Sequence, residues 1–286
     1  MTKIKQENRW LKQFLQQHRP DIIISDNRFG FYSKQVPSFF ITHQLYIQTG
    51  LGSWANKIAQ QFNYRQITHF SSCWVPDNHG VDALAGRLSN PESLPPIPVQ
   101  YLGPLSRMQA CIAPNTGIPL LIILSGPEPQ RSIFESILLS ALQTVSVPTI
   151  IIRGLTGTAT PANIPAHVTI YDHVKASELN QLICAAEMII SRAGYTTIMD
   201  VLKLGKKIIL VPTPGQAEQE YVAHWLHSRQ LAYAVEQSHF DLQHALEAAK
   251  AFTFTKAIYH QEAYKTVLQT VIETITKKSG ATLSTE

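Results

Sequence analysis

The chain has 286 residues, of which 44% are hydrophobic and 15% are charged. This length predicts two domains or one large one, and the small charged fraction argues against long, charged, disordered tails. The formal net charge of +4 is spread along the chain rather than clustered. Such a charge suits an anionic ligand or an anionic membrane surface, whereas nucleic-acid binding needs a stripe of Lys and Arg, so we expect no nucleic-acid partner.

Cysteine usage and the N-terminus predict the compartment. Cys73, Cys111 and Cys184 are widely separated and form no CxxC pair, which predicts reduced, buried thiols rather than a disulfide framework or a zinc site. Residues 1–20 are charged and rich in Gln, without the apolar core of a signal peptide, and no apolar run reaches about 18 residues. We therefore expect a cytoplasmic protein without a membrane span.

Helical and extended patterns alternate along the chain. A first helix, with Ile4, Leu11 and Phe14 at helical spacing, ends at Pro20. Short, β-branched apolar runs predict strands at 21–25, 38–42, 69–74, 119–124, 149–152, 168–171, 188–191 and 207–211. Helices are predicted at 130–145, 177–186, 196–204, 218–228 and 256–277. This alternation predicts an α/β protein built on parallel sheets.

A proline-rich stretch, Asn90–Thr116, predicts a linker with one short strand at Val99–Leu102. It separates a first unit, residues 1–105, from a complete doubly wound domain over residues 106–255. The long helix at 256–278 follows, and 279–286 is expected to be a frayed tail. The first unit has three strong strand signals and opens with a helix, whereas a doubly wound half normally opens with a strand and a Gly-rich loop.

Three loops of the second unit carry chemistry at the ends of predicted strands, where α/β sheets bind ligands. Ala193 and Gly194 precede a helix, so their backbone N–H groups and the helix dipole suit a phosphate. Gln219 and Glu220 in another helix start suit sugar hydroxyls, and Arg131 beyond the Ser125-Gly126 turn suits a phosphate charge. Taken singly, each feature is equally typical of a structural turn, a solvated helix start or a surface arginine.

Together the loops carry a specific combination. It reads Ser191-Arg192-Ala193-Gly194-x-Thr196-x-x-x-Asp200, then Gly205, Val211-Pro212 and Gln219-Glu220-Tyr221. This set resembles the nucleotide-sugar half of glycosyltransferase family 28. Residues 21–51 are similar to the second half of the family's acceptor domain, so the resemblance covers most of the chain. It implies the GT-B fold, with two Rossmann-like domains facing a cleft, the first one incomplete, and the last helix packed back on the first domain.

The resemblance also assigns donor-site roles. Asp200 is expected to bind the ribose hydroxyls, which suits a carboxylate acceptor. The amides of Ala193 and Gly194 are expected to hold the diphosphate without a metal, and backbone near His173 and Val174 to contact uracil. The other implied donor residues are Ser125, Gly126, Arg131, Arg192, Thr196, Gln219 and Glu220. The chain departs from the family at Pro127, Glu128, His173, Asp200 and Glu220. The departure at Glu220 leaves the sugar open, and Glu128 would repel a diphosphate if it faced one.

The catalytic base is less clearly marked. His43 matches a histidine of the family's acceptor-side motif, and Asp26 is the other candidate for removing the acceptor proton. Nothing before Asp21 matches the family's Gly-x-Gly-His loop. The chain therefore resembles an N-terminally truncated member, with the opening segment lost upstream or supplied by a partner chain.

The resemblance implies an inverting, metal-independent transfer of a hexose or N-acetylhexosamine from a UDP-sugar, with no cofactor. The acceptor is unknown, and a lipid-linked one would fit a role in the cell envelope at the inner face of the membrane. Two alternatives are a donor-binding subunit that is inactive alone and a nucleotide-sugar hydrolase or epimerase. Leu51, Trp54 and Ile58 form an apolar stripe that either packs in the fold or contacts a bilayer.

Overall fold

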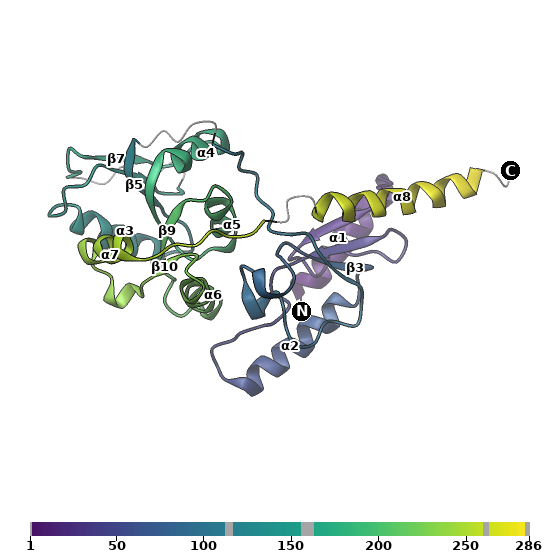
Figure 1. Cartoon of the computed structure of the whole chain (residues 1–286). Helices are drawn as coiled ribbons and strands as arrows, with labels where there is room; N and C mark the ends of the chain where they lie inside the picture. The colour runs from purple at the N-terminus through teal and green to yellow at the C-terminus, as the bar shows by residue number, and fades with distance from the viewer. Residues whose placement is uncertain (1, 112–116, 156–162, 260–262, 284–286) are drawn as a thin grey trace. The chain divides into compact units, whose positions relative to one another are not determined.

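The chain divides into two compact units in its computed structural model. The structure describes residues 2–111, 117–155, 163–259 and 263–283, with side chains up to residue 276. Unit 1 comprises Met1–Leu105 and Tyr259–Glu286, and unit 2 comprises Ser106–Ile258 (Figure 1). The division falls at residue 106, where the proline-rich stretch predicts the linker, and the last helix belongs to unit 1.

Unit 1 is built on a four-stranded parallel sheet in the order β1-β2-β3-β4. The fourth strand comes from the proline-rich stretch, where residues 99–101 pair with β3. The elements are α1 (Thr2–Gln17), β1 (Ile23–Asp26), β2 (Ser38–Ile41), α2 (Ser53–Ile67), β3 (Ser72–Val75), two 3-10 turns (Gly80–Asp82 and Gly86–Leu88), β4 (Val99–Tyr101) and α8 (Ala263–Leu283).

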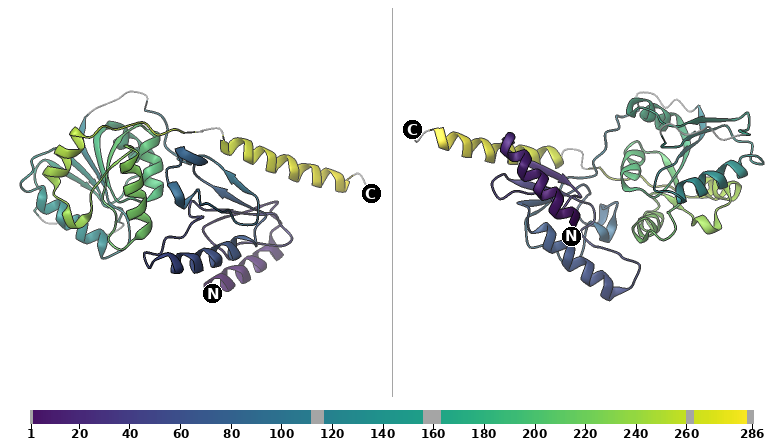
Figure 2. Two further views of the ribbon diagram at one scale, coloured as in Figure 1. Left: turned by 60° about the horizontal axis from the view of Figure 1, so that its bottom comes forward. Right: turned by 180° about the vertical axis from the view of Figure 1, so that it is seen from behind.

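Both faces of the unit 1 sheet are covered. Adjacent residues of a strand point to opposite faces, so neighbouring residues of one strand belong to different clusters. Phe40 packs with Leu45, Ile67 and Val75 in one cluster. On the other face, Phe39, Trp74 and Leu102 pack against Tyr264, Val267, Leu268 and Val271 of α8. Helix α8 thus lies along the unit 1 sheet, as both views of Figure 2 show. It runs to Leu283, so part of the expected tail is helical.

The predicted apolar stripe of α2 is exposed. Leu51, Trp54 and Ile58 are 73%, 68% and 59% exposed. Of the two alternatives, packing in the fold does not hold for these three side chains. They form a solvent-facing apolar surface on unit 1, which keeps peripheral membrane contact open as a prediction. No helix among the described residues is long and apolar enough to cross a membrane.

Unit 2 is a six-stranded parallel sheet in the order β10-β9-β8-β5-β6-β7. The chain runs outward through β6 and β7 and then returns to the centre, so the direction of winding changes between β5 and β8. The elements are β5 (Ile118–Ile123), α3 (Gln130–Ala141), β6 (Thr149–Ile152), β7 (Val168–Tyr171), α4 (Ala176–Ala185), β8 (Ala186–Ser191), α5 (Tyr195–Lys203), β9 (Lys207–Leu210), α6 (Ala217–Ser228), β10 (Tyr233–Ala234), a 3-10 turn (Gln237–His239) and α7 (Leu242–Ala251).

The core of unit 2 occupies both faces of this sheet. On one face, Leu120 and Ile190 pack with Phe134 of α3 and Leu242 of α7. The alternate strand residues, such as Ile189, are fully buried too, and α4 and α5 contact the central strands. Continuous apolar strands are typical of a parallel sheet covered by helices on both faces. The crevice at a change of winding is where such sheets bind ligands, and here it lies between β5 and β8.

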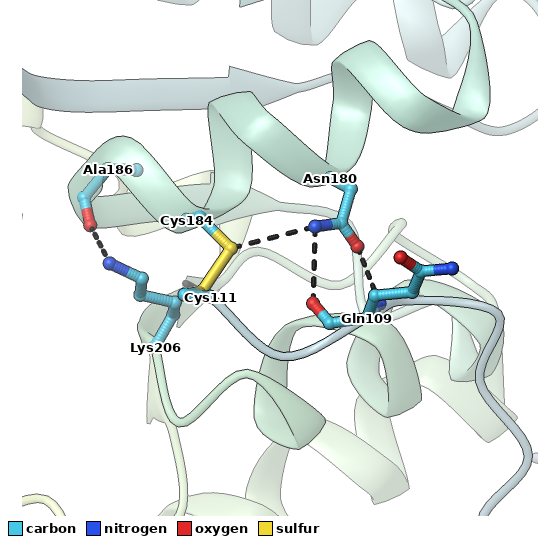
Figure 3. The surroundings of a disulfide bond; sticks show 6 residues. All are labelled: Gln109, Cys111, Asn180, Cys184, Ala186 and Lys206. Atoms are coloured by element: carbon cyan, nitrogen blue, oxygen red, sulfur yellow. Dashed lines mark hydrogen bonds between the residues drawn. A yellow bond between two sulfur atoms is a disulfide. The ribbon is translucent and has the colours of Figure 1, made fainter. Parts of the chain in front are cut away.

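A disulfide corrects one sequence-based prediction. Cys111 and Cys184 are bonded, with their Cα atoms 5.6 Å apart, and only Cys73 is free among the described residues (Figure 3). The prediction of three reduced thiols is therefore wrong for two of them. The pair is separated by 73 residues in sequence, and only folding brings Cys111 of the linker against the end of α4. The cytoplasmic prediction loses the support of its cysteine argument.

Asn180 forms hydrogen bonds with Gln109, two residues before the disulfide-bonded Cys111. Its amide accepts from the backbone N–H of Gln109 at 2.8 Å and donates to the Gln109 carbonyl at 3.2 Å. The linker from Ser106 to Cys111 is thus bound to unit 2 at several points. This anchoring matters for the site, because Ser106 contacts Asp200.

Candidate functional site

The candidate site is the carboxyl edge of the unit 2 sheet at the β5–β8 crevice. Three loops leave adjacent strands there: Ser125–Gly126 after β5, Ser191–Gly194 after β8 and Val211–Gln216 after β9. The structure therefore brings together most of the donor residues predicted from sequence. His173 and Val174 follow β7, at the far end of the same edge, where His173 is exposed and Val174 is buried.

The start of α5 is open to a ligand. Gly194 is the residue before the helix, and no side chain caps the helix N-terminus. A Cβ built on Gly194 would meet nothing within 4 Å, so space adjoins the helix end. Ala193 is buried and Thr196 is exposed in the first turn. Uncapped N–H groups beside open space, at the positive end of a helix dipole, form a suitable binding place for an anion.

Arg192 belongs to this loop and is only 1% exposed. Its guanidinium donates to the carbonyls of Val211, Pro212 and Gln130 and to the Gln237 side chain, and it lies 4.3 Å from the ring centroid of Phe134. Among the described residues no carboxylate pairs with it. Burial lowers the pKa of Arg192 to about 10. The guanidinium ties the loops together, and its uncompensated charge favours an anion at this edge.

Asp200, predicted to bind ribose, is buried on α5 at 5% exposure. One carboxylate oxygen accepts from the Ser106 hydroxyl at 2.6 Å, and the other has no hydrogen-bond partner among the described residues. Burial raises the pKa of Asp200, while the Ser106 hydrogen bond and the nearby Arg107 and Lys203 oppose that rise. The carboxylate thus keeps acceptor capacity for a ligand hydroxyl. The role of Ser106 was not predicted from sequence, because the serine is 94 residues away.

Gln219 and Glu220 stabilise the loop after β9. Gln219 accepts from the Thr213 N–H and donates to the Gln216 side chain, while Glu220 accepts from the Gly215 N–H. Both side chains therefore have partners within the loop, and their predicted contact with a sugar stays a prediction. The same loop contains a residue that sequence reasoning missed: the hydroxyl of Thr213 is buried without a hydrogen-bond partner among the described residues.

Arg131 does not present its charge to a ligand. Its side chain is 5% exposed, and its guanidinium pairs with Glu128 at 2.6 Å and with Glu135 at 3.1 Å. Glu128, one of the positions at which the chain departs from the family, pairs with Arg131, whose hydrogen bond lowers the pKa of the glutamate. We therefore leave Arg131 out of the candidate site. Ser125 and Gly126 stay in it, and Gly126 has a φ of 105°, a conformation that favours glycine.

The two candidate bases lie at the carboxyl edge of the unit 1 sheet. Asp26 is the last residue of β1 and is exposed, while His43 follows β2 by two residues and is half-buried. The strand register pairs Asp26 with Ile41, so both side chains belong to one edge. No three His, Cys, Asp or Glu side chains gather as a metal site in the part of the chain that the structure describes.

Comparisons with known proteins agree with this geometry. Residues 160–277 match the glycosyltransferase family 28 C-terminal domain. The chain is 24% identical over 242 residues to a UDP-N-acetylglucosamine–N-acetylmuramyl-(pentapeptide) pyrophosphoryl-undecaprenol N-acetylglucosamine transferase of Sulfurihydrogenibium sp. (strain YO3AOP1), covering 82% of this chain and 65% of that one. It is 26% identical over 222 residues to the protein of the same name from Clostridium novyi (strain NT), covering 73% and 57%.

A solved structure supports the fold. The crystal structure of Acinetobacter baumannii MurG matches with a TM-score of 0.53 and 16% identity, covering 95% of this chain and 80% of that one. The chain spans about three fifths of the length of the two curated relatives that it matches. The fold is GT-B, with two parallel-sheet units. Residues 160–277, which span much of unit 2 and reach into α8, are therefore similar to the C-terminal domain of glycosyltransferase family 28.

Proposed function

We propose that the chain binds a UDP-sugar at the carboxyl edge of unit 2 and transfers its hexose or N-acetylhexosamine to a lipid-linked acceptor, with inversion and without a metal. The observation that carries this proposal is the open, uncapped start of α5, preceded in the same loop by the buried Arg192, whose guanidinium has no carboxylate partner among the described residues. A diphosphate supplies the negative charge that such a place favours.

The leaving group of the transfer is UDP, so negative charge builds on its β-phosphate as the glycosidic bond breaks. N–H groups at the α5 start and the Arg192 charge would stabilise that charge without reorganising, which lowers the barrier. Asp200 would hold the ribose through its free oxygen. Proton removal from the acceptor hydroxyl would fall to His43 or Asp26, by general base catalysis.

The nucleotide is tested first, by calorimetric titration of the full chain with UDP, UMP and uridine. We expect UDP to bind more tightly than UMP, and UMP more tightly than uridine, because the site is built around phosphate. Absence of any heat with UDP would refute the donor site, and equal affinity for UDP and uridine would refute its phosphate-binding part.

A turnover assay then distinguishes three possible functions: a transferase, a hydrolase and a donor-binding subunit. The probes are UDP-N-acetylglucosamine and UDP-glucose, each with and without N-acetylmuramyl-pentapeptide pyrophosphoryl-undecaprenol, the acceptor named for the curated relatives. UDP release that requires the acceptor supports the transferase. Release without acceptor supports a hydrolase instead, and UDP binding without any turnover supports a donor-binding subunit that needs a partner chain.

The candidate bases are compared in the same assay. If the chain transfers sugar, His43→Ala or Asp26→Asn should lower kcat by about 10²–10⁴-fold, whichever residue is the base, and leave the UDP Kd unchanged. The variant of the other residue serves as its control. Full activity in both variants would remove both residues from the mechanism while leaving the donor site intact.

A further inference from the structure

The loop after β9 contains a polar group that the fold leaves unused. Thr213 is 2% exposed, and its hydroxyl oxygen has no hydrogen-bond partner among the described residues. Buried polar groups are nearly always paired, because an unpaired one loses its water contacts without compensation. A valine would fill similar space without that loss. The hydroxyl therefore keeps its capacity to donate a hydrogen bond to a ligand.

The backbone of Thr213 is fixed from both sides, so the hydroxyl is held in place. Its N–H donates to the Gln219 side chain at 3.0 Å, and its carbonyl accepts from the Gln216 N–H at 3.0 Å. Gln219 itself is held by Gln216. This loop can therefore present the hydroxyl to a ligand without first ordering itself, which reduces the entropic cost of binding.

The position of the hydroxyl points to the candidate phosphate site. A Cβ built on Gly126 would lie 4.0 Å from the Thr213 oxygen. Gly126 follows β5 and Thr213 follows β9, and β8 lies between these two strands in the sheet. The two loops therefore approach each other across the end of β8, where Ser191 leads to Gly194 and the open start of α5.

We propose that the Thr213 hydroxyl donates a hydrogen bond to a phosphate oxygen of the bound nucleotide diphosphate and so positions it at the α5 start. This inference rests on the proposed donor site and names a further residue of it. Since the oxygen is buried, a neighbouring segment has to move for the contact to form, and the Ser125–Gly126 turn lies beside it. Gly126 is exposed and has no side chain to obstruct a phosphate.

The test compares Thr213→Val and Thr213→Ser with the parent chain, by calorimetry with UDP and uridine and by thermal unfolding. A hydrogen bond to a charged group predicts that Thr213→Val weakens UDP binding about ten-fold or more, and leaves uridine binding unchanged. Its Tm should stay equal or rise, because the unpaired hydroxyl is removed. Thr213→Ser keeps the hydroxyl and should bind UDP like the parent, and Thr213→Ala is the second hydroxyl-free variant if the valine does not fold.

Thr149→Val is the matched control. Thr149 is also a buried threonine, but it lies at the opposite end of the sheet and its hydroxyl donates to the Val147 carbonyl at 2.8 Å. We expect this variant to lower the Tm and leave the UDP Kd unchanged, the reverse of Thr213→Val. If the parent binds UDP and Thr213→Val binds it equally well, the inference is overturned while the proposed function stands. If the parent does not bind UDP, both fall.

Discussion

Two buried aspartates, one in each unit, are held in different ways. Asp77, two residues after β3 in unit 1, is fully buried and accepts from the N–H groups of Asn78, Leu84 and Ala85 and from the Ser89 hydroxyl. Asp200 in unit 2 accepts from Ser106 alone. Burial raises the pKa of both carboxyl groups. The first carboxylate is satisfied by the fold, whereas the second keeps an oxygen for a ligand.

This difference separates a structural carboxylate from a candidate binding one. Four donors around Asp77 fix the turns between residues 77 and 90, and their geometry leaves no room for another partner. Asp200 has a buried position with little compensation from the protein, which costs stability unless a ligand donates to it. Burial alone therefore does not distinguish the two roles, and the number of donors does.

The largest effect is expected from breaking the satisfied carboxylate. Asp77→Ala leaves three backbone N–H groups unpaired in the interior and removes one acceptor of the Ser89 hydroxyl, which should lower the free energy of unfolding by about 3–5 kcal/mol. Chemical denaturation measures this, and Asp77→Asn, which keeps one acceptor oxygen, should lose less. Folded Asp77→Ala protein should bind UDP normally, since the site is in the other unit. A loss below about 1 kcal/mol would contradict the structural role.

The disulfide should have the next largest effect. Closing a 73-residue loop stabilises the folded chain by up to about 4 kcal/mol through the unfolded state, so Cys184→Ser should lower stability by an amount approaching this. Thiol alkylation provides a check on the bond itself. Burial raises the pKa of Cys73 to about 12, so its thiol should stay unreactive in the folded protein. Alkylation of two cysteines in the folded, non-reduced chain would contradict the disulfide.

Asp200 should affect binding rather than folding. Asp200→Asn should weaken UDP binding about ten-fold, roughly 1.4 kcal/mol, and change stability by less than that amount. A 2′,3′-dideoxy analogue of UDP sharpens the test, because it should lose affinity for the parent chain but not for Asp200→Asn. Equal losses with both proteins would show that the carboxylate does not read the ribose hydroxyls.

The smallest effect concerns pH. Because the folded pKa of Asp200 is raised, its carboxyl contributes stability below the unfolded pKa of about 3.9, and this contribution is lost as pH rises through the folded pKa. Ligand binding should follow the opposite direction, since the ribose contact needs the carboxylate. The UDP affinity of the parent chain divided by that of Asp200→Asn should therefore fall as the pH is lowered. The midpoint of this fall should lie above pH 3.9. Titration of UDP itself cancels in this ratio, and a flat ratio between pH 4 and 8 would contradict the prediction.

Several features of this protein were determined by its sequence alone. Apolar runs of strand length, separated by helical patterns, predicted the parallel α/β units, and the prolines after Asn90 predicted their boundary. The loop from Ser191 to Gly194 was predicted at a strand end, because local pattern decides where strands stop. Strand order and the exposure of Trp54 were not predictable from local pattern, since they depend on which distant surfaces meet. The packing of α8 on unit 1 was implied by the family resemblance alone.

Within the site, residue types and spacing identified Gly194 and Asp200, but only the tertiary structure decided what each side chain contacts. In the folded chain Arg131 forms ion pairs, and Ser106 donates a hydrogen bond to Asp200. The hydroxyl of Thr213 has no hydrogen-bond partner among the described residues. The fold also joins Cys111 to Cys184 across 73 residues. The physical reason is the same throughout. Secondary structure follows from local sequence, whereas pairing of charges, hydroxyls and thiols follows from contacts between residues that are far apart in the chain.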